Sequence, residues 1–108
     1  MNGRKRQVQV AEEIAHATAD FFARESNYES LITVTHANIS PDLKNVMIFL
    51  TVLPENMEVK ALAFAKRSRT DVREHIRQKC RLKFLPTIDF EIDYGEKNRQ
   101  RIDDLTRR

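Results

Sequence analysis

Residues 46–53, with the sequence VMIFLTVL, decide the fold of this 108-residue chain. β-Branched and aromatic residues are frequent here, and apolar side chains occupy both alternating sets of positions, which is typical of a strand inside a sheet. Residues 31–40 form a second alternating stretch, in which Ile32, Val34 and His36 are predicted to share one face. The Ser-Pro-Asp sequence at residues 40–42 predicts a turn, so the two stretches are expected to pair as a hairpin.

Toward the C-terminus, Pro54 ends the central strand and is well placed to open a helix. The helical spacing of the apolar residues that follow is interrupted at residues 67–70, where Thr70 is predicted to cap a further helix that runs to about Cys80. A third alternating strand follows at residues 88–92. The helical crossover before it is long enough to return to the sheet, so the second and third strands are predicted to be parallel.

Two more helices complete the predicted order. Apolar residues at spacings of three and four predict a first helix over residues 6–24. A turn is predicted at residues 93–95, followed by a short final helix around residues 99–105. The order α-β-β-α-α-β with a short C-terminal helix predicts a single α+β domain over residues 1–108, with three helices on one face of a three-stranded sheet. This is the type II KH topology, a nucleic-acid-binding arrangement, and residues 1–5 and 106–108 are expected to be flexible.

Composition narrows the possible functions. With 41 % hydrophobic and 32 % charged residues, the chain has the profile of a soluble globular protein. It lacks the run of about 20 apolar residues that a membrane span requires, and no apolar segment follows the basic N-terminus as in a signal peptide, so a cytoplasmic protein is expected. Only two glycines and one cysteine occur. They cannot build a phosphate-binding glycine loop, a dinucleotide fingerprint or a cysteine-based metal cage, so no cofactor or metal is expected.

Positive charge is concentrated in one stretch. The chain carries a net charge of +3, whereas residues 66–83 contain eight basic residues against two acidic ones, a net of +6. Such local charge favours a polyphosphate partner, because each neutralised phosphate releases counterions. The alternative is a charged helix face that meets only water. The predicted phosphate contacts are Lys66, Arg67, Arg69, Arg73, Arg77, Lys79, Arg81 and Lys83.

The spacing of the arginines supports an outward-facing cationic stripe. Arg69, Arg73 and Arg77 recur every four residues, beside an apolar stripe of Val72, Ile76 and Cys80. On a helix the apolar stripe would cover the core and the arginines would face outward next to it. The basic N-terminus is predicted to form a secondary contact, with a disordered charged end as the alternative; its basic residues are Arg4, Lys5 and Arg6.

Several motifs resemble one known family. VAEEI at residues 10–14, ISPDL at 39–43 and RLKFLP at 81–86, ahead of an alternating strand, are similar to ribosome-binding factor A, a family of bacterial small-subunit assembly factors. The resemblance implies a cytoplasmic, monomeric, non-enzymatic protein that binds the 30S subunit and its 16S rRNA during late maturation and rRNA processing. It also implies a role in growth at low temperature, and neither a small-molecule substrate nor a membrane partner.

The chain departs from the family where the two central helices meet. Family members carry an Ala-x-Gly kink there in place of the Gly-x-x-Gly loop of ordinary KH domains, whereas residues 68–70 here read Ser-Arg-Thr. Either a Ser or Thr cap makes the kink, or the helices join differently.

Three rival functions remain. A general KH-type binder of single-stranded RNA or DNA is disfavoured by the missing glycines, while a protein-interaction module would direct the basic helix at an acidic partner. An enzyme ranks last: Cys80 is predicted to pack on the apolar stripe, His16 and His75 to lie on the surface, and His36 to be structural. Few exposed aromatic residues are predicted, so recognition is expected to use RNA shape and phosphates rather than base stacking.

Overall fold

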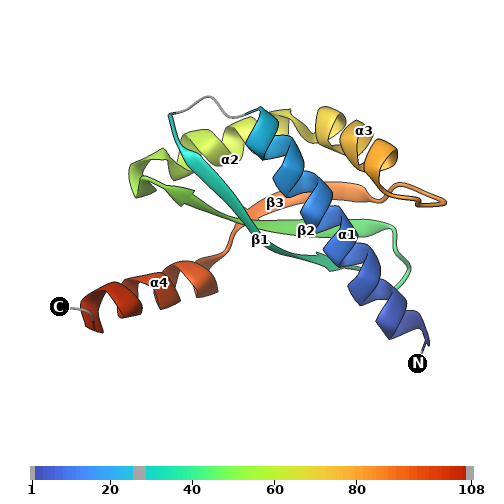
Figure 1. Cartoon of the computed structure of the whole chain (residues 1–108), viewed down its shortest axis with the longest axis horizontal. Coiled ribbons are helices and arrows are strands. Elements are labelled where there is room, and N and C mark those ends of the chain that lie inside the picture. Colours follow the sequence, from blue (N-terminus) through green and yellow to red (C-terminus); the bar gives the residue numbers. More distant parts are fainter. Residues whose placement is uncertain (1, 26–28, 107–108) are drawn as a thin grey trace.

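A computed structural model describes residues 2–25 and 29–106 and confirms the predicted order of elements (Figure 1). A 3-10 turn, Glu55–Met57, joins the central strand to the second helix. The main elements in chain order are α1 (Asn2–Arg24), β1 (Leu31–Ile39), β2 (Asn45–Leu53), α2 (Glu58–Arg67), α3 (Arg69–Lys79), β3 (Thr87–Ile92) and α4 (Tyr94–Thr106).

The sheet has the order β1-β2-β3. β1 pairs antiparallel with β2, and β2 pairs parallel with β3, which confirms both the hairpin and the parallel crossover. β2 is the central strand. On one of its faces the apolar side chains of Met47 and Phe49 are half-buried, and the other face lies under the helix layer. Val46, Ile48, Leu50 and Val52 are buried on that face.

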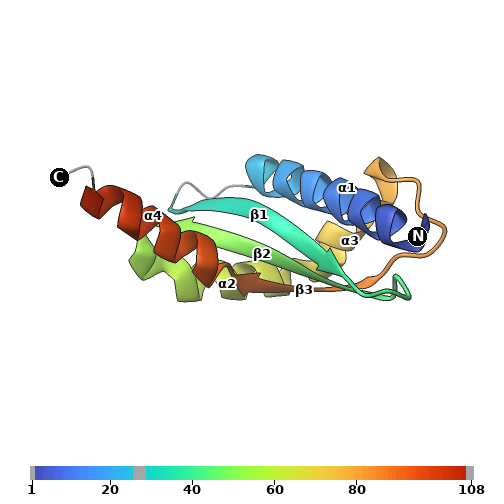
Figure 2. The same ribbon diagram turned by 90° about the horizontal axis from the view of Figure 1, so that it is seen from below.

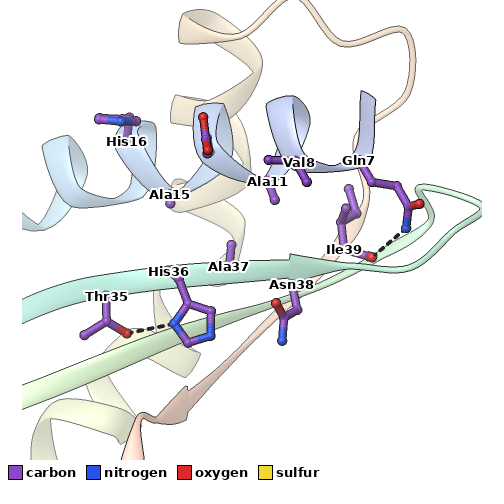
Figure 3. Close-up of a pocket in the computed structure, with 11 residues that line it drawn as sticks. Gln7, Val8, Ala11, Ala15, His16, Thr35, His36, Ala37, Asn38 and Ile39 are labelled. Carbon is purple, nitrogen blue, oxygen red and sulfur yellow. Dashed lines mark hydrogen bonds between the residues drawn. The ribbon is translucent and has the colours of Figure 1, made fainter. Parts of the chain in front are cut away.

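A β-bulge at Thr35 changes which residues of β1 face the helices. Val34 pairs with Leu50, but the next pair is His36 with Phe49, so one residue is inserted between them. Figure 3 shows Ala37 directed toward α1 and His36 directed away from it. The prediction that His36 shares the face of Ile32 and Val34 is therefore wrong. Its ring instead stacks on Phe49 on the opposite face, with ring centroids 4.5 Å apart.

One core joins the three helices to the sheet, as predicted. Ile14 of α1, Ala65 of α2 and Val72 of α3 are all fully buried against the same strands. α1, α2 and α3 therefore cover one face of the sheet. α4 lies apart from this layer and projects at the end of the molecule opposite the N-terminus (Figures 1 and 2).

The helix limits differ from the prediction at both ends of the chain. α1 begins at Asn2, four residues before the predicted start. The turn predicted at residues 93–95 is the start of α4, because Asp93 acts as its N-cap: Oδ1 accepts a hydrogen bond from the Glu96 amide at 3.0 Å. α4 is therefore 13 residues long rather than short. Flexibility of the chain ends stays a prediction, and residues 1, 107 and 108 lie outside the described part.

Ion pairs hold α4 against the start of α2. Lys97 Nζ lies 2.8 Å from Glu55 and 3.0 Å from Glu58. Hydrogen bonds to these two carboxylates raise the pKa of Lys97. Arg101 also pairs with Glu55, so polar contacts contribute to the position of a helix that lies apart from the main helix layer.

Candidate nucleic-acid interface

The junction between α2 and α3 is built without glycine. Ser68 separates the two helices with φ −88° and ψ 4°, a conformation open to any L-residue. The side chain is buried, and its hydroxyl donates a hydrogen bond to the Phe64 carbonyl oxygen at 2.8 Å. Thr70 lies inside α3, so the prediction that Thr70 caps this helix is wrong. Because no left-handed residue is needed, this junction does not require a glycine.

An acidic residue on the edge strand faces this junction. Asp89 Oδ1 lies 3.1 Å from Lys66 Nζ and 3.5 Å from a terminal guanidinium nitrogen of Arg69. Desolvation opposes ionisation of Asp89, but the Phe90 amide and the Lys66 ammonium outweigh it and lower the pKa of this carboxyl. Two of the eight predicted contacts therefore share one carboxylate of the protein itself.

The predicted arginine stripe is exposed, but each member has a partner within the protein. Arg73 Nε donates to the Pro86 carbonyl oxygen at 3.2 Å, and Arg77 Nε donates to Glu74 at 3.1 Å. The Arg77 and Glu74 side chains are 61 % and 51 % exposed. Exposed pairs of this kind contribute little to stability because water and salt screen them, so an incoming phosphate can replace the carboxylate.

Lys79 and Arg81 lie in a setting of mixed charge. Both are exposed, and both line a hollow of about 730 Å³ between α1 and the end of α3. Glu12, Glu13 and Asp20 of α1 line the same hollow. Phosphate binding at this end of α3 is therefore opposed by nearby acids, which makes these two residues weaker candidates than those near the junction.

His75 is not the surface residue that its position suggests. Its side chain is 12 % exposed, and Nε2 forms a 2.8 Å hydrogen bond with Asp20 Oδ2. That bond is the main cause of the lowered pKa of Asp20. The pair ties α3 to α1, so this histidine has a structural contact, whereas His16 is exposed as predicted.

Arg67 at the end of α2 and Lys83 in the loop between α3 and β3 are exposed, and neither forms an ion pair with a carboxylate of the described residues. In the N-terminal set, Lys5 and Arg6 are exposed, while the side chain of Arg4 lies outside the described part of the chain.

The structure brings Arg6 and Lys83 together at one groove, which we call the loop groove. It has a volume of about 640 Å³ and lies between the start of α1, the β1–β2 turn and the α3–β3 loop. Lys44 and Phe84 also line it, and the sequence predicted neither. Nothing local marks Lys44, because only the folded chain places the turn beside the loop. In the described part of the chain the exposed aromatic residues are Phe84 and Tyr94, at 78 % and 59 %, which agrees with the expectation that few are exposed.

The other candidate features are Cys80, the possible metal ligands and a further hollow. Cys80 packs against the core as predicted, and burial raises the pKa of its thiol. Within residues 2–25 and 29–106, no group of three His, Cys, Asp or Glu side chains is arranged to hold a metal ion. A hollow of about 700 Å³ between α1 and β1 contains none of the predicted basic residues, and Gln7 closes one end by donating to the Ile39 carbonyl oxygen at 3.3 Å (Figure 3).

Nor does any helix in the described part of the chain have the length and apolar character needed to cross a membrane.

Comparison with known proteins decides the family. The model of the ribosome-binding factor A family matches residues 6–106. The chain belongs to the ribosome-binding factor A family. Ribosome-binding factor A of Bradyrhizobium sp. (strain ORS 278) is 33 % identical over an alignment of 110 positions. The alignment covers 97 % of this chain and 80 % of that protein.

Solved structures of ribosome-binding factor A agree with the fold. The crystal structure of the Thermus thermophilus protein superposes with a TM-score of 0.72 at 18 % identity, over 80 % of this chain and 94 % of that one. A homology model of Thermus thermophilus ribosome-binding factor A, fitted into the cryo-EM map of a 30S complex, has a TM-score of 0.65 at 17 % identity and covers 79 % of this chain and 92 % of that one. At such identities the likeness concerns the fold alone, and it is consistent with the KH-like arrangement.

Proposed function

We propose that this protein is a non-enzymatic assembly factor that binds the 30S ribosomal subunit through its 16S rRNA, during late maturation and rRNA processing. Membership of the ribosome-binding factor A family supports ribosome binding, and the related Thermus protein was fitted into a 30S complex. The observation that carries the rRNA contact is the set of exposed cations around the helix junction and the α3–β3 loop. The protein would act as a cytoplasmic monomer.

The proposed contact surface runs from the junction to the loop groove. Arg67 and Arg69 lie at the junction, and the bond from Arg73 to the Pro86 carbonyl connects α3 with the loop that carries Lys83. Arginine can hold a phosphate through two parallel hydrogen bonds, whereas lysine acts as a point charge. Since backbone contacts of this kind do not read bases, the surface would recognise the shape of folded rRNA.

The junction itself disfavours the general KH-type alternative. A phosphate that approached the junction closely would meet the carboxylate of Asp89, which already holds Lys66 and Arg69. The buried Ser68 also takes the place where a glycine would let a backbone and a phosphate approach. Binding through the exposed side chains next to the junction avoids both obstacles.

Co-sedimentation with ribosomal particles tests the proposal. The wild-type protein is expected to travel with free 30S subunits and not with 70S ribosomes. The double variant Arg73→Glu/Arg77→Glu should lose this association, because it reverses two cations on the proposed surface. Lys60→Glu/Arg99→Glu is the matched control, since both residues are exposed elsewhere and the net charge changes equally. If both double variants lost co-sedimentation equally, the loss would depend only on net charge, and the proposal would be contradicted.

A cellular experiment tests the role in maturation. Cells depleted of the protein should accumulate 16S rRNA with unprocessed ends, and the defect should be stronger at low temperature. The wild-type gene and the control variant should restore processing, but the Arg73→Glu/Arg77→Glu variant should not. Normal 16S ends in depleted cells would remove the processing role and leave ribosome binding as the function.

A further inference from the structure

Phe84 is the most exposed aromatic side chain in the described part of the chain. It is 78 % exposed and lies in the loop between α3 and β3, where Leu82 and Leu85 on either side turn toward the core. Single exposed apolar residues are common on protein surfaces, so exposure alone proves little. The groups around the ring give Phe84 its significance.

Three cations from distant parts of the sequence line the loop groove together with Phe84. Arg6 comes from α1, Lys44 from the β1–β2 turn and Lys83 from the loop itself. Lys83 Nζ lies 5.9 Å from the centroid of the Phe84 ring. In Figures 1 and 2 the N-terminus, the β1–β2 turn and the α3–β3 loop lie at the same end of the molecule, opposite α4.

One acid, Asp42, also lines the groove, but the turn engages its carboxylate. Oδ1 accepts hydrogen bonds from the Ser40 hydroxyl at 2.6 Å and from the Lys44 amide at 3.0 Å. With three cations and one anion, the groove has a net charge of +2. Its walls are otherwise largely apolar, formed by residues such as Leu43 and Leu85.

We propose that the loop groove binds an unpaired nucleotide of ribosomal RNA, with its base stacked on Phe84 and its phosphates held by Lys83, Lys44 and Arg6. The volume of about 640 Å³ falls within the range of about 300–1,000 Å³ of small-ligand sites. An unpaired nucleotide offers both a flat π-face and an adjacent anion, which matches an exposed ring flanked by cations. An acidic peptide would satisfy the cations but would leave the ring without a stacking partner. This inference rests on the proposed function, since it names one part of the rRNA contact.

A tryptophan reporter tests the stacking directly. The chain contains no tryptophan, so Phe84→Trp introduces a single fluorophore into the groove. Stacking on a base should quench this fluorescence when protein-free 16S rRNA is added. Tyr94→Trp is the control, because Tyr94 is exposed at the start of α4 and does not line the loop groove. We expect the fluorescence of the tryptophan at position 84 to be quenched and that of the tryptophan at position 94 to stay unchanged. Equal quenching at both positions would overturn the inference, as would no quenching at position 84 when anisotropy shows that the RNA is bound.

Substitutions at Phe84 separate stacking from a general apolar contact. Phe84→Ala and Phe84→Leu should each weaken binding to 30S subunits about tenfold, because both remove the π-face, while Phe84→Trp should retain affinity. Full affinity of Phe84→Leu, with loss only in Phe84→Ala, would indicate an apolar protein partner and overturn the proposal. All three variants should fold, since the ring contributes little to the core.

The same experiments distinguish this inference from the proposed function. If wild-type protein binds 30S subunits with strong salt dependence but Phe84→Ala binds equally well, the stacking site is wrong and the rRNA-binding function stands. If wild-type protein does not bind 30S subunits at all, both the stacking site and the proposed function are wrong. A change at Phe84→Trp seen only with intact subunits and never with protein-free rRNA would identify a ribosomal protein and overturn the nucleotide site.

Discussion

Removal of the Asp89 carboxylate should strengthen the binding of RNA. In the free protein this carboxylate lies 3.1 Å from Lys66 and 3.5 Å from Arg69, so both cations are partly neutralised. The Asp89→Asn variant keeps the shape of the side chain and releases both. If both then contact phosphates, the slope of log affinity against log salt should steepen by about 1.4, taking about 0.7 per phosphate for single-stranded RNA.

The slope change predicts a measurable effect over an ordinary salt range. Between about 50 and 200 mM salt, the ratio of variant to wild-type affinity should fall about sevenfold, with the variant tighter at the low end. The loss of the pairs should cost at most about 1 kcal/mol of stability, because all three side chains are 40–49 % exposed. Fluorescence anisotropy with a labelled 16S rRNA fragment measures the affinities, and thermal unfolding measures the stability.

A control on the same strand separates released cations from total charge. Glu91→Gln changes the net charge by the same amount, two residues farther along β3, and no ion pair joins Glu91 to the described residues. Its salt slope should match that of the wild-type protein. An Asp89→Asn slope equal to that of Glu91→Gln would refute the reasoning, since Lys66 and Arg69 would then have no part in RNA binding.

Three further predictions concern the stability of the fold. Asp93→Ala removes the N-cap of α4 and the acceptor of the Thr35 hydroxyl at 2.5 Å, so the free energy of unfolding should fall by about 2 kcal/mol in a denaturant titration. Desolvation raises the pKa of Asp93, but hydrogen bonds from Glu96 and Thr35 outweigh it and lower this pKa from 3.8. The stabilisation by Asp93 should therefore be present above about pH 4 and be lost as the pH falls below 3.8. An effect of Asp93→Ala that did not change with pH down to about pH 2 would contradict this. Ile48→Ala, at a fully buried position of β2, should cost about 3 kcal/mol, and a loss below about 1 kcal/mol would show that the core lies elsewhere. Lys97→Met should speed hydrogen exchange in α4 without changing exchange in the sheet, and unchanged exchange in α4 would show that these ion pairs do not hold it. Because the pKa of Lys97 is raised, its ammonium charge persists until the pH rises past 10.5.

The fold could be predicted because its determinants are local. The two-sided apolar pattern of residues 46–53 indicates a central strand, and the crossover is long enough for β3 to lie parallel to it, as it does. The bulge at Thr35 could not be read this way, since alternation in sequence does not show an inserted residue. The start of α4 had a signal that was interpreted as a turn: Asp93 followed three residues later by Glu96 is an N-cap pattern.

The candidate site was only partly accessible from the sequence. Charge density identified Arg67, Arg69 and Arg73, because they are close in the chain. Their partners were not accessible: Asp89 lies about 20 residues beyond the junction and is brought to it only by the parallel pairing of β3. The loop groove combines three distant segments, so neither Lys44 nor Phe84 could be assigned to it before the fold was known.

Site-specific photo-crosslinking to purified 30S subunits tests most directly whether the cationic surface faces ribosomal RNA. A photoreactive residue at Arg67, exposed at the end of α2, should form covalent adducts with 16S rRNA. The same residue at Glu91, on the exposed face of β3, should form none. Adducts of position 67 with ribosomal proteins alone, or equal rRNA adducts from both positions, would contradict the account.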